Sequence, residues 1–239
     1  MAKLTPSINE LAYLCLNTVR GKTAVSEVIS VRQVKFLIKV VRAELLKQDA
    51  NKGYTADSYI IQDLGCVPVK LADVAECCQV THGCTILRTV NPIPSTIELH
   101  HKQLFTRIGP VDRTQAPFDV IPYERVPYEG ENKFHKNIIK AFTQNNKGYV
   151  YFIVPRAKAK MIKYVNIQGV FEDPEQVAAF TTCEGTACYT DDNAFPIKQW
   201  MVDPLCQIVI QKYLKLESQV PLDQSNNAKA DITSQAEGS

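Results

Sequence analysis

The sequence predicts an α+β fold with three parts: a helical bundle from N- and C-terminal helices, a central antiparallel β-rich region, and an extended polar C-terminal tail. Apolar residues recur at helical spacing over residues 7–51 and again near the C-terminus. Between them, short runs of β-branched and aromatic residues alternate with Pro and Gly, as in sheets. Residues 218–239 are polar with few apolar anchors, a composition that does not fold alone.

These patterns also predict where one part ends and the next begins. The expected parts are an N-terminal helical hairpin (1–56), a β-rich region (57–170), C-terminal helices packing on the hairpin (171–217), and the tail (218–239).

Two helices are expected in the hairpin, each with a start signal. Ser7 and Glu10 have the spacing of a capping box, and Gly21 is the expected end of that helix. Ser30 with Gln33 repeats the start signal, and the second helix should end near residues 51–53. Two amphipathic helices joined by a short connection should pack as an antiparallel pair.

In the central region, a hairpin should join residues 138–144 to 149–154 across an Asn- and Gly-containing turn. Pro68, Pro122 and Pro127 fall inside apparent strands, so those strands should be edges, bulged or broken. The stretch PRAKAK at 155–160 should form a loop after a strand.

Helical signals return after residue 170. Asp173-Pro174 is typical of a helix start, because Pro is tolerated in a first turn. Residues 195–216 form a longer apolar-rich segment, in which Pro204 either kinks the helix or begins a second one.

Composition narrows the class of protein. The 239 residues are 45% hydrophobic, and 27 basic against 25 acidic residues leave a net charge of +2. A whole-protein field that would draw the chain onto DNA or a membrane is therefore not expected. We expect a soluble protein made in a reducing cytoplasm, since the sequence shows neither a membrane-spanning run nor a signal peptide.

Catalytic chemistry is not predicted. The four histidines are His82, His100, His101 and His135. No Gly-rich phosphate loop, nucleophile elbow or zinc helix accompanies them. We expect no enzyme, no catalytic residue and no cofactor.

Eight cysteines leave two questions open. A zinc site is the alternative for one cluster, but adjacent Cys77 and Cys78 would point to opposite faces of a strand, so a metal is not favoured. Cys183 and Cys188 bracket a turn, where two free thiols are favoured over a disulfide. Cys15 and Cys206 should lie on apolar helix faces. The cluster weighed for zinc is Cys66, Cys77, Cys78, His82 and Cys84.

Charge is unevenly distributed along the chain. Residues 133–163 contain eight Lys or Arg and no acidic residue. A solvated hairpin edge protected by lysines is the ordinary interpretation. The alternative is a face toward DNA phosphates or an acidic partner, which needs such point charges. The candidates for that face are Lys147, Arg156, Lys158, Lys160 and Lys163. A helix-turn-helix DNA reader is not favoured, because the second helix is not markedly basic.

Several distinctive strings resemble one family over roughly residues 7–217. They are VRQVKFLIKVVRAELLKQDANKG, LGCVPVKLADVAECC, TRIGPVD, VNIQGVFEDPEQVAAF and FPIKQWMVDPLCQIVIQKYL. Together they are similar to virion ring proteins of crAss-like phages, a head-to-tail connector and tail-barrel adaptor family.

The resemblance implies a structural virion protein in a homo-oligomeric ring of twelve copies beneath the portal. Its partners would be the portal protein and adjacent ring or tail proteins, with non-specific contact to double-stranded DNA in the lumen and none to a membrane. It would be part of the neck or tail, assembled in the host cytoplasm. The alternatives are another virion part, such as a tail-tube or capsid-associated protein, and a small cytosolic thiol or metal-binding enzyme.

Overall fold

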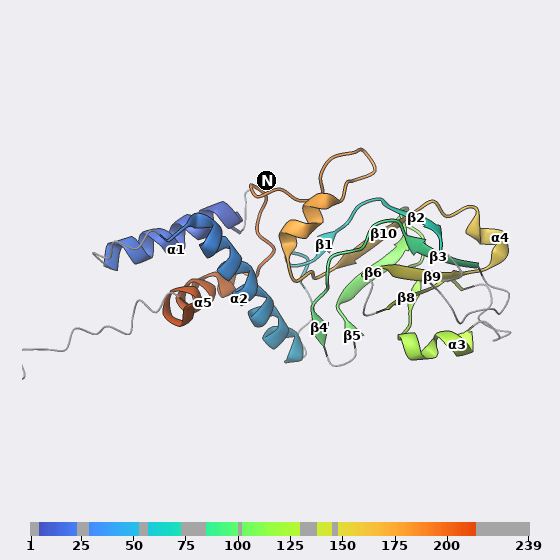
Figure 1. The fold of residues 1–239 in the computed structure, drawn as a ribbon, viewed down its shortest axis with the longest axis horizontal. Coiled ribbons are helices and arrows are strands. Elements are labelled where there is room, and N and C mark those ends of the chain that lie inside the picture. Colours follow the sequence, from blue (N-terminus) through green and yellow to red (C-terminus); the bar gives the residue numbers. More distant parts are fainter. Residues whose placement is uncertain are drawn as a thin grey trace, which may run out of the picture.

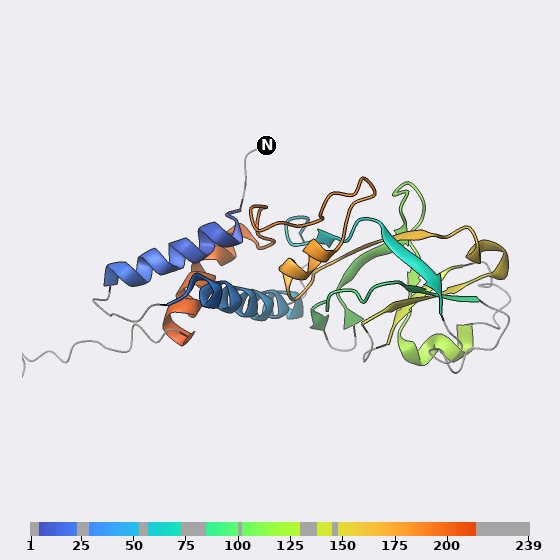
Figure 2. The same cartoon turned by 45° about the horizontal axis from the view of Figure 1, so that its top comes forward.

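A computed structural model of the chain describes residues 5–22, 29–52, 57–72, 85–99, 102–129, 138–144 and 148–213. Within these ranges the fold is mixed α/β, with several helices and one curled, mostly antiparallel sheet (Figure 1). The molecule is elongated, with the long helices at one end and the sheet at the other (Figures 1 and 2). The tail predicted at 218–239 lies outside the described residues.

The two N-terminal helices begin where their caps predict. Helix α1 spans Ile8–Lys22, and the Ser7 N–H donates to Glu10 Oε2 at 2.7 Å while the Glu10 N–H donates to Ser7 Oγ at 3.3 Å. Helix α2 spans Val31–Asn51, and Ser30 Oγ accepts from the Gln33 N–H at 3.2 Å. Both capping predictions are therefore confirmed. In Figure 1, α1 runs away from the sheet and α2 returns toward it.

The C-terminal helical run packs on this pair. A 3-10 turn, Gln199–Met201, leads into α5, Val202–Ile208, and a π-helical turn follows over Val209–Tyr213. Pro204 lies in the first turn of α5, where its missing N–H costs no helical bond. We call α1, α2 and residues 199–213 the helical unit. Its core includes Ile8, Leu11, Val34, Ile38, Val41, Met201, Leu205 and Val209, and Phe195 from the preceding segment packs into it.

The strands of the sheet are short. Those in the curled sheet are β1 (Gln62–Asp63), β2 (Val67–Leu71), β3 (Thr85–Thr89), β6 (Phe105–Pro110), β7 (Asp119–Val120), β8 (Lys140–Thr143), β9 (Val150–Val154) and β10 (Tyr164–Gly169). A separate hairpin pairs β4 (Glu98–Leu99) with β5 (Lys102–Gln103). We call the strands and the short helices between them the β unit.

The sheet curls until its two edges meet. Its order is β1-β10-β2-β3-β9-β8-β7, and β6 pairs with the other side of β10. The Phe118 N–H donates to the Ile108 carbonyl of β6 at 2.7 Å, while the next residue, Asp119, donates to Ile139 before β8 at 3.2 Å. Phe118 and Asp119 thus bond to the two free sides of the sheet, which gives it the outline of a small barrel.

The predicted hairpin of residues 138–144 and 149–154 is present as β8 and β9, with Phe142 opposite Tyr151. Strand β9 is buried on both faces. Residues such as Val150 and Phe152 join the core inside the curl. Tyr151 and Ile153 join a smaller core outside it, which the short helix α3 (Val126–Glu129) covers through Val126.

Two segments differ from the sequence prediction. The apparent strand with Pro122 and Pro127 is confined to β7, and a 3-10 turn (Tyr123–Arg125) and α3 follow it, because Pro122 and Pro127 fit helix first turns. The predicted PRAKAK loop contains a one-turn helix, α4 (Arg156–Ala159), whose Lys158 N–H donates to the Pro155 carbonyl at 2.8 Å.

Two further segments that contain proline differ only in detail from what the sequence predicts. Pro68 does not sit at a sheet edge. It lies where β2 changes partner, from β10 at Pro68 to β3 at Val69. The segment opened by Asp173 is a 3-10 helix, Pro174–Ala179.

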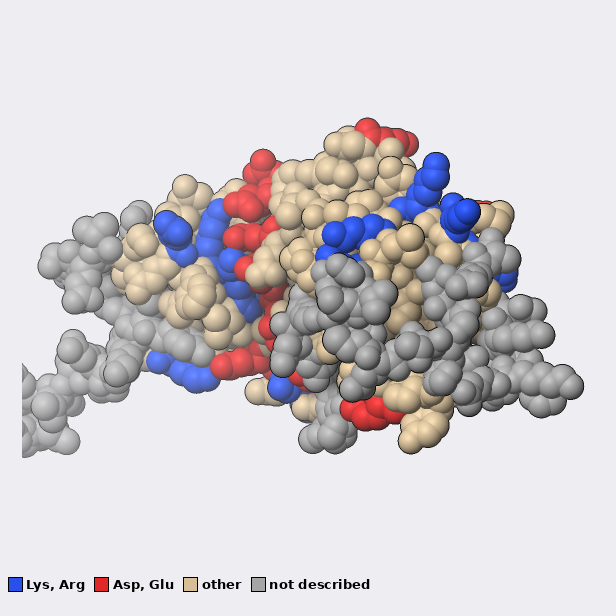
Figure 3. All heavy atoms as spheres, turned by 45° about the vertical axis from the view of Figure 1, so that its right-hand side comes forward, with Lys and Arg blue, Asp and Glu red and all other residues tan. Residues whose placement is uncertain are grey.

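Basic residues on one face of α2 attach the helical unit to the segment that follows β10. Lys35 donates to Asp191 at 2.6 Å, and Lys39 donates to Glu175 at 2.8 Å. Arg42 continues this face toward the sheet, since positions four and seven apart share one side of a helix. Figure 3 shows the resulting blue and red side chains next to each other at the junction. Among the described residues, no helix combines the length and apolarity needed to cross a membrane.

Candidate partner-binding surface

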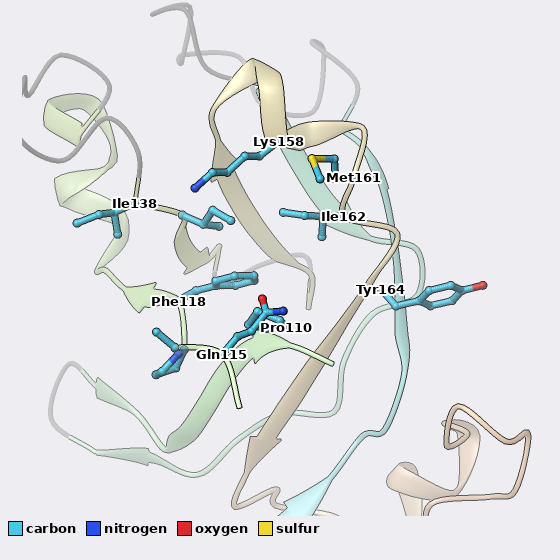
Figure 4. A pocket seen from close by; sticks show the side chains of 11 residues that line it. Pro110, Gln115, Phe118, Ile138, Lys158, Met161, Ile162 and Tyr164 are labelled. Carbon is cyan, nitrogen blue, oxygen red and sulfur yellow. The ribbon is translucent and has the colours of Figure 1, made fainter. Parts of the chain in front are cut away.

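The β unit carries an apolar pocket at the open end of the curled sheet. Its volume is about 670 Å³, within the range of roughly 300–1,000 Å³ typical of ligand pockets. Three segments form its walls: the connection between β6 and β7, residues 138–139 before β8, and the turn from α4 into β10 (Figure 4). The lining residues are Pro110, Gln115, Ala116, Pro117, Phe118, Ile138, Ile139, Lys158, Met161, Ile162 and Tyr164.

Arg107 on β6 holds the first wall in place. Its guanidinium donates to the carbonyls of Pro110 and Gln115, both at 3.2 Å, which fixes the connection above its own strand. Gly109 allows the close approach, because a Cβ there would lie 3.1 Å from Pro117 Cα. In the same connection, hydrogen bonds from Thr114 hold the pKa of the Asp112 carboxyl below its ordinary value.

Asp63 ties the far side of this wall to the sheet. Its carboxylate pairs with Arg113 and accepts from Asn166 Nδ2 at 2.6 Å and Gln168 Nε2 at 2.8 Å. The Asp63 carboxylate thus joins β1, β10 and the pocket wall in one polar network. Such a network fixes the wall before any partner binds.

The floor of the pocket is continuous with the core of the curled sheet. Phe118, Ile139 and Ile162 each pack against that core, and Phe118 meets Phe152 edge-on at 5.9 Å between ring centroids. The rim is apolar and exposed: Met161 is 79% and Tyr164 is 54% exposed. A partner side chain entering the pocket would therefore extend a core that already exists.

Three of the predicted basic residues lie together beside this pocket. Lys158 lines it, and Lys160 and Lys163 are exposed on the turn from α4 into β10. Figure 4 shows the Lys158 side chain reaching toward the wall that contains Ile138. Apolar lining with ammonium groups at the rim suits an extended peptide that carries apolar and acidic residues.

The other predicted basic residues do not join this group in the described structure. Arg156 belongs to α4, but its side chain lies outside what the structure describes, as does Lys147 altogether. Lys140, from the same basic stretch, is 1% exposed and pairs with Glu129 of α3. It stabilises the outer core and cannot face DNA or a partner.

Comparison with known proteins assigns a family to this architecture. A family model described as phage tail ring protein 2 matches residues 10–232. The chain is also 31% identical over 231 residues to "Ring protein 2" of Bacteroides phage crAss001, which covers 94% of this chain and 97% of that protein.

The chain belongs to the phage tail ring protein 2 family. The predicted resemblance to crAss-like phage ring proteins is thereby confirmed. The match spans the residues of both the helical unit and the pocket-bearing β unit.

A second apolar surface lies on the helical unit of this ring-protein fold. Tyr13 and Leu14 on α1 are 56% and 49% exposed, and Phe36 on α2 is 60% exposed. Other apolar residues of the same helices are fully buried in the core, so Tyr13, Leu14 and Phe36 are not needed to pack the helical unit. Large exposed apolar side chains are typical of surfaces that contact other proteins.

The cysteines pair differently from the prediction. Cys183 forms a disulfide with Cys66, their Cα atoms 5.1 Å apart, while Cys188 is a free thiol. The expected pair of free thiols is therefore corrected: Cys66, far away in sequence, is brought to Cys183 by the turn between β1 and β2. Burial raises the pKa of the Cys188 thiol to about 11.

Cys15 and Cys206 lie on apolar helix faces as predicted, with their Sγ atoms 3.1 Å apart. The hydrogen bond to Cys206 and burial raise the pKa of the Cys15 thiol. Among the described residues, no group of three potential metal ligands lies together. Cys77, Cys78, Cys84 and all four histidines lie outside the described residues.

Sequence reasoning located the basic residues but missed the pocket. Its lining comes from three segments spread over residues 110–164, none of which has a motif. One signal for the pocket was present in the sequence: Met161, Ile162 and Tyr164 are apolar residues next to lysines at the start of a strand. The start of a strand does not by itself require apolar residues there.

Proposed function

We propose that this protein is a structural, non-enzymatic virion subunit that forms one ring of the head-to-tail connector beneath the portal. The observation that carries the proposal is the family match, because it spans residues 10–232 and almost all of a protein named as a ring protein. In that position the ring would help to form the channel through which DNA is ejected.

The two apolar surfaces support ring formation. A closed ring of identical copies needs two different, complementary surfaces on each subunit. Here one surface surrounds the pocket of the β unit and the other lies on the helical unit, at opposite ends of an elongated molecule (Figure 1). Most residues of both surfaces are apolar, as is common at contacts between subunits.

The finer parts of the proposal concern copy number and neighbours. We place twelve copies in the ring, with the portal and adjacent ring or tail proteins above and below. The bundle of N- and C-terminal helices would form one end of each copy, and the tail at 218–239 would contact a neighbouring subunit or the portal. Assembly would take place in the host cytoplasm, before the ring becomes part of the neck or tail.

The basic stretch would face either DNA in the lumen or an acidic neighbour. Lys147, Arg156, Lys158, Lys160 and Lys163 are the residues in question. Contact with DNA there would be non-specific, because lysines bind phosphates without reading bases. A net charge of +2 fits a channel that lets DNA pass without holding it tightly.

Stoichiometry tests the proposal directly. Quantitative mass spectrometry of gradient-purified, nuclease-treated particles should give about one copy of this chain per portal subunit. A large excess over the portal would indicate a repeating tail-tube or capsid-associated protein instead. Absence from the particles would show that the protein is not a virion component.

A charge reversal tests the basic face. The double variant Lys158→Glu, Lys160→Glu should reduce either particle assembly or DNA ejection, because like charges would meet phosphates or an acidic neighbour. Reversing the exposed Lys52, the residue that follows α2, is the matched control. Unchanged particle yield and infectivity in the double variant would remove these lysines from the proposed face.

A further inference from the structure

We propose that the β-unit pocket of one copy binds the C-terminal segment Val220-Pro221-Leu222 of the neighbouring copy in the ring. The inference rests on the proposed ring and names the contact that would join its subunits. It connects an apolar pocket of the β unit with an apolar segment that lies outside the described residues.

The pocket fits a short apolar segment better than a compact ligand. Its lining is mainly aliphatic, proline and aromatic, with Gln115 and Lys158 as the polar side chains. Its floor is already packed against the core through Phe118 and Ile162. A few apolar side chains from another chain could fill the volume of about 670 Å³ and shield the exposed rim at Met161.

Residues 214–239 supply a matching segment. After Leu216 the sequence is polar except for Val220-Pro221-Leu222, Ile232 and single alanines. Proline disfavours helical backbone at the residue before it, so the sequence Val220-Pro221 favours the extended conformation that a groove-binding peptide needs. A conformation that is restricted before binding costs less entropy to order. Val220-Pro221-Leu222 offers three adjacent apolar residues, whereas Ile232 is a single apolar residue among polar ones.

Charge favours the same pairing. Residues 218–239 contain three acidic residues, Asp223, Asp231 and Glu237, against one basic residue, Lys229. Asp223 directly follows Leu222, and the pocket rim carries exposed Lys160 and Lys163.

The arrangement of the molecule points to a neighbour as the recipient. The described chain ends at Tyr213, next to α5 in the helical unit, whereas α4, which adjoins one pocket wall, lies at the far end of the β unit (Figure 1). Leu222 is the ninth residue after Tyr213, so the chain between them can span at most about 32 Å. In a head-to-tail ring the helical end of one copy can lie beside the β unit of the next.

A photo-reactive amino acid at position 222 of the full chain tests the contact. Equal amounts of ¹⁴N chain with the probe and ¹⁵N chain without it would be assembled and irradiated. The same probe would be placed in the chain of purified particles. We expect mixed-isotope cross-links to residues 110–118 or 158–164, identified by peptide mass spectrometry. The same probe at Ser225 is the control and should give at least fivefold fewer of these links.

The second experiment measures the same cross-links in a variant whose pocket is filled. Ala116→Trp places a large side chain in the pocket from an exposed loop position, so folding should be unaffected. It should reduce the cross-links at least tenfold. Glu184→Trp, on an exposed turn that does not line the pocket, should leave them unchanged. Circular dichroism melting curves of both variants check that the fold is retained.

The outcomes separate this inference from the proposed function. Cross-links within one chain, to the helical unit of a neighbour, or to the portal would overturn the pocket assignment, as would links that persist in Ala116→Trp. A particle ratio of one copy per portal subunit would still support the connector ring in those cases. Loss of that ratio would instead remove the ring on which the inference rests.

Discussion

At the scale of single residues, Arg42 joins the two ends of the molecule. Its side chain is fully buried, and its guanidinium donates to the Pro196 and Phe171 carbonyls, both at 2.7 Å. The guanidinium also lies 5.6 Å from the ring centroid of Phe195. Burial lowers the pKa of Arg42 to about 10, so the side chain is charged at neutral pH. The hydrogen-bond acceptors of this charged group are backbone carbonyls and not carboxylates.

Replacing Arg42 should therefore destabilise the fold strongly. Arg42→Met should lower the free energy of unfolding by about 3 kcal/mol or more, because two buried carbonyls lose their donor. Arg42→Lys should also lose much of this stability, since an ammonium cannot reproduce the planar fork. Urea unfolding followed by circular dichroism measures both. Arg32→Met, exposed on the same helix, is the control. A difference below about 0.5 kcal/mol between the Met variants would contradict the assigned role.

Tyr189 gives a pH-dependent test at the same scale. The residue is 4% exposed, and its hydroxyl has no hydrogen-bond partner among the described residues. Burial and the nearby carboxylates of Asp191 and Glu175 raise its pKa above the ordinary value of 10.0. The unfolded chain therefore loses this proton first as pH rises. The corresponding stability is complete below about pH 10 and is lost as pH rises through the raised value.

Tyr189→Phe should remove this part of the alkaline destabilisation. At neutral pH the variant should be as stable as the original protein or more stable, because an unpaired hydroxyl leaves the core. Urea unfolding at about pH 8 and pH 11 should show a smaller loss for the variant. Tyr189 raises the pKa of the nearby Arg42 guanidinium, so the difference between the two proteins reports the titration of this interacting pair. Equal losses would show that Tyr189 reaches solvent in the fold.

At the scale of elements, the turn between β1 and β2 depends on a glycine. Gly65 has a φ of +68°, and a Cβ there would lie 2.5 Å from the Thr181 carbonyl oxygen. The Cys66 N–H donates to that same carbonyl at 3.1 Å, and Cys66 is bonded to Cys183. The turn and the segment around residues 180–188 are thus held together at very close approach.

A pair of glycine substitutions separates the two effects at such turns. Gly185 has a φ of +86° but no atom within 4 Å of a Cβ, so Gly185→Ala should cost about 1 kcal/mol from the backbone alone. Gly65→Ala should cost at least about twice as much, because the backbone of the neighbouring segment must also move. Thermal and urea unfolding measure both. Equal costs would show that the neighbouring segment yields without strain.

Elements with local start signals were predictable from the sequence, and others were not. The capping residues Ser7 and Ser30 satisfy helix N–H groups of their own helices, so the helix starts follow from nearby residues. Residues 123–129 were misjudged, because apolar and aromatic content suggested a strand while the prolines fitted helix turns. The strand of Pro68 was expected to be an edge, bulged or broken, and it changes partner at the proline, so no ladder hydrogen bond is lost there.

At the scale of the whole molecule, exposed apolar side chains at the two ends have different expected roles. The pocket surface continues the core, whereas Tyr13, Leu14 and Phe36 project from a helical unit that is already packed. In a ring these helical side chains would contribute to association and little to the stability of one copy.

Phe36→Glu should therefore reduce assembly without changing the fold. We expect a melting temperature within about 2 °C of the original protein, since an exposed position loses little packing. Self-association in analytical ultracentrifugation should weaken at least tenfold, because a charge would be buried in the interface. Lys47→Glu, exposed on the same helix, is the control. Unchanged association in Phe36→Glu would exclude this face from the contact between copies.

The sequence by itself determined the long helices, the β8–β9 hairpin, the basic stretch and, through its distinctive strings, the family. Each depends on residues close together in the chain: caps, periodic apolar positions, a turn and a run of lysines. Only the tertiary structure decided which lysines meet at the pocket, which one is buried beside Glu129, and that Cys66 bonds to Cys183. It also decided that the sheet curls until Phe118 reaches Ile108. These features join residues far apart in the chain, and their partners are chosen by packing that no local pattern encodes.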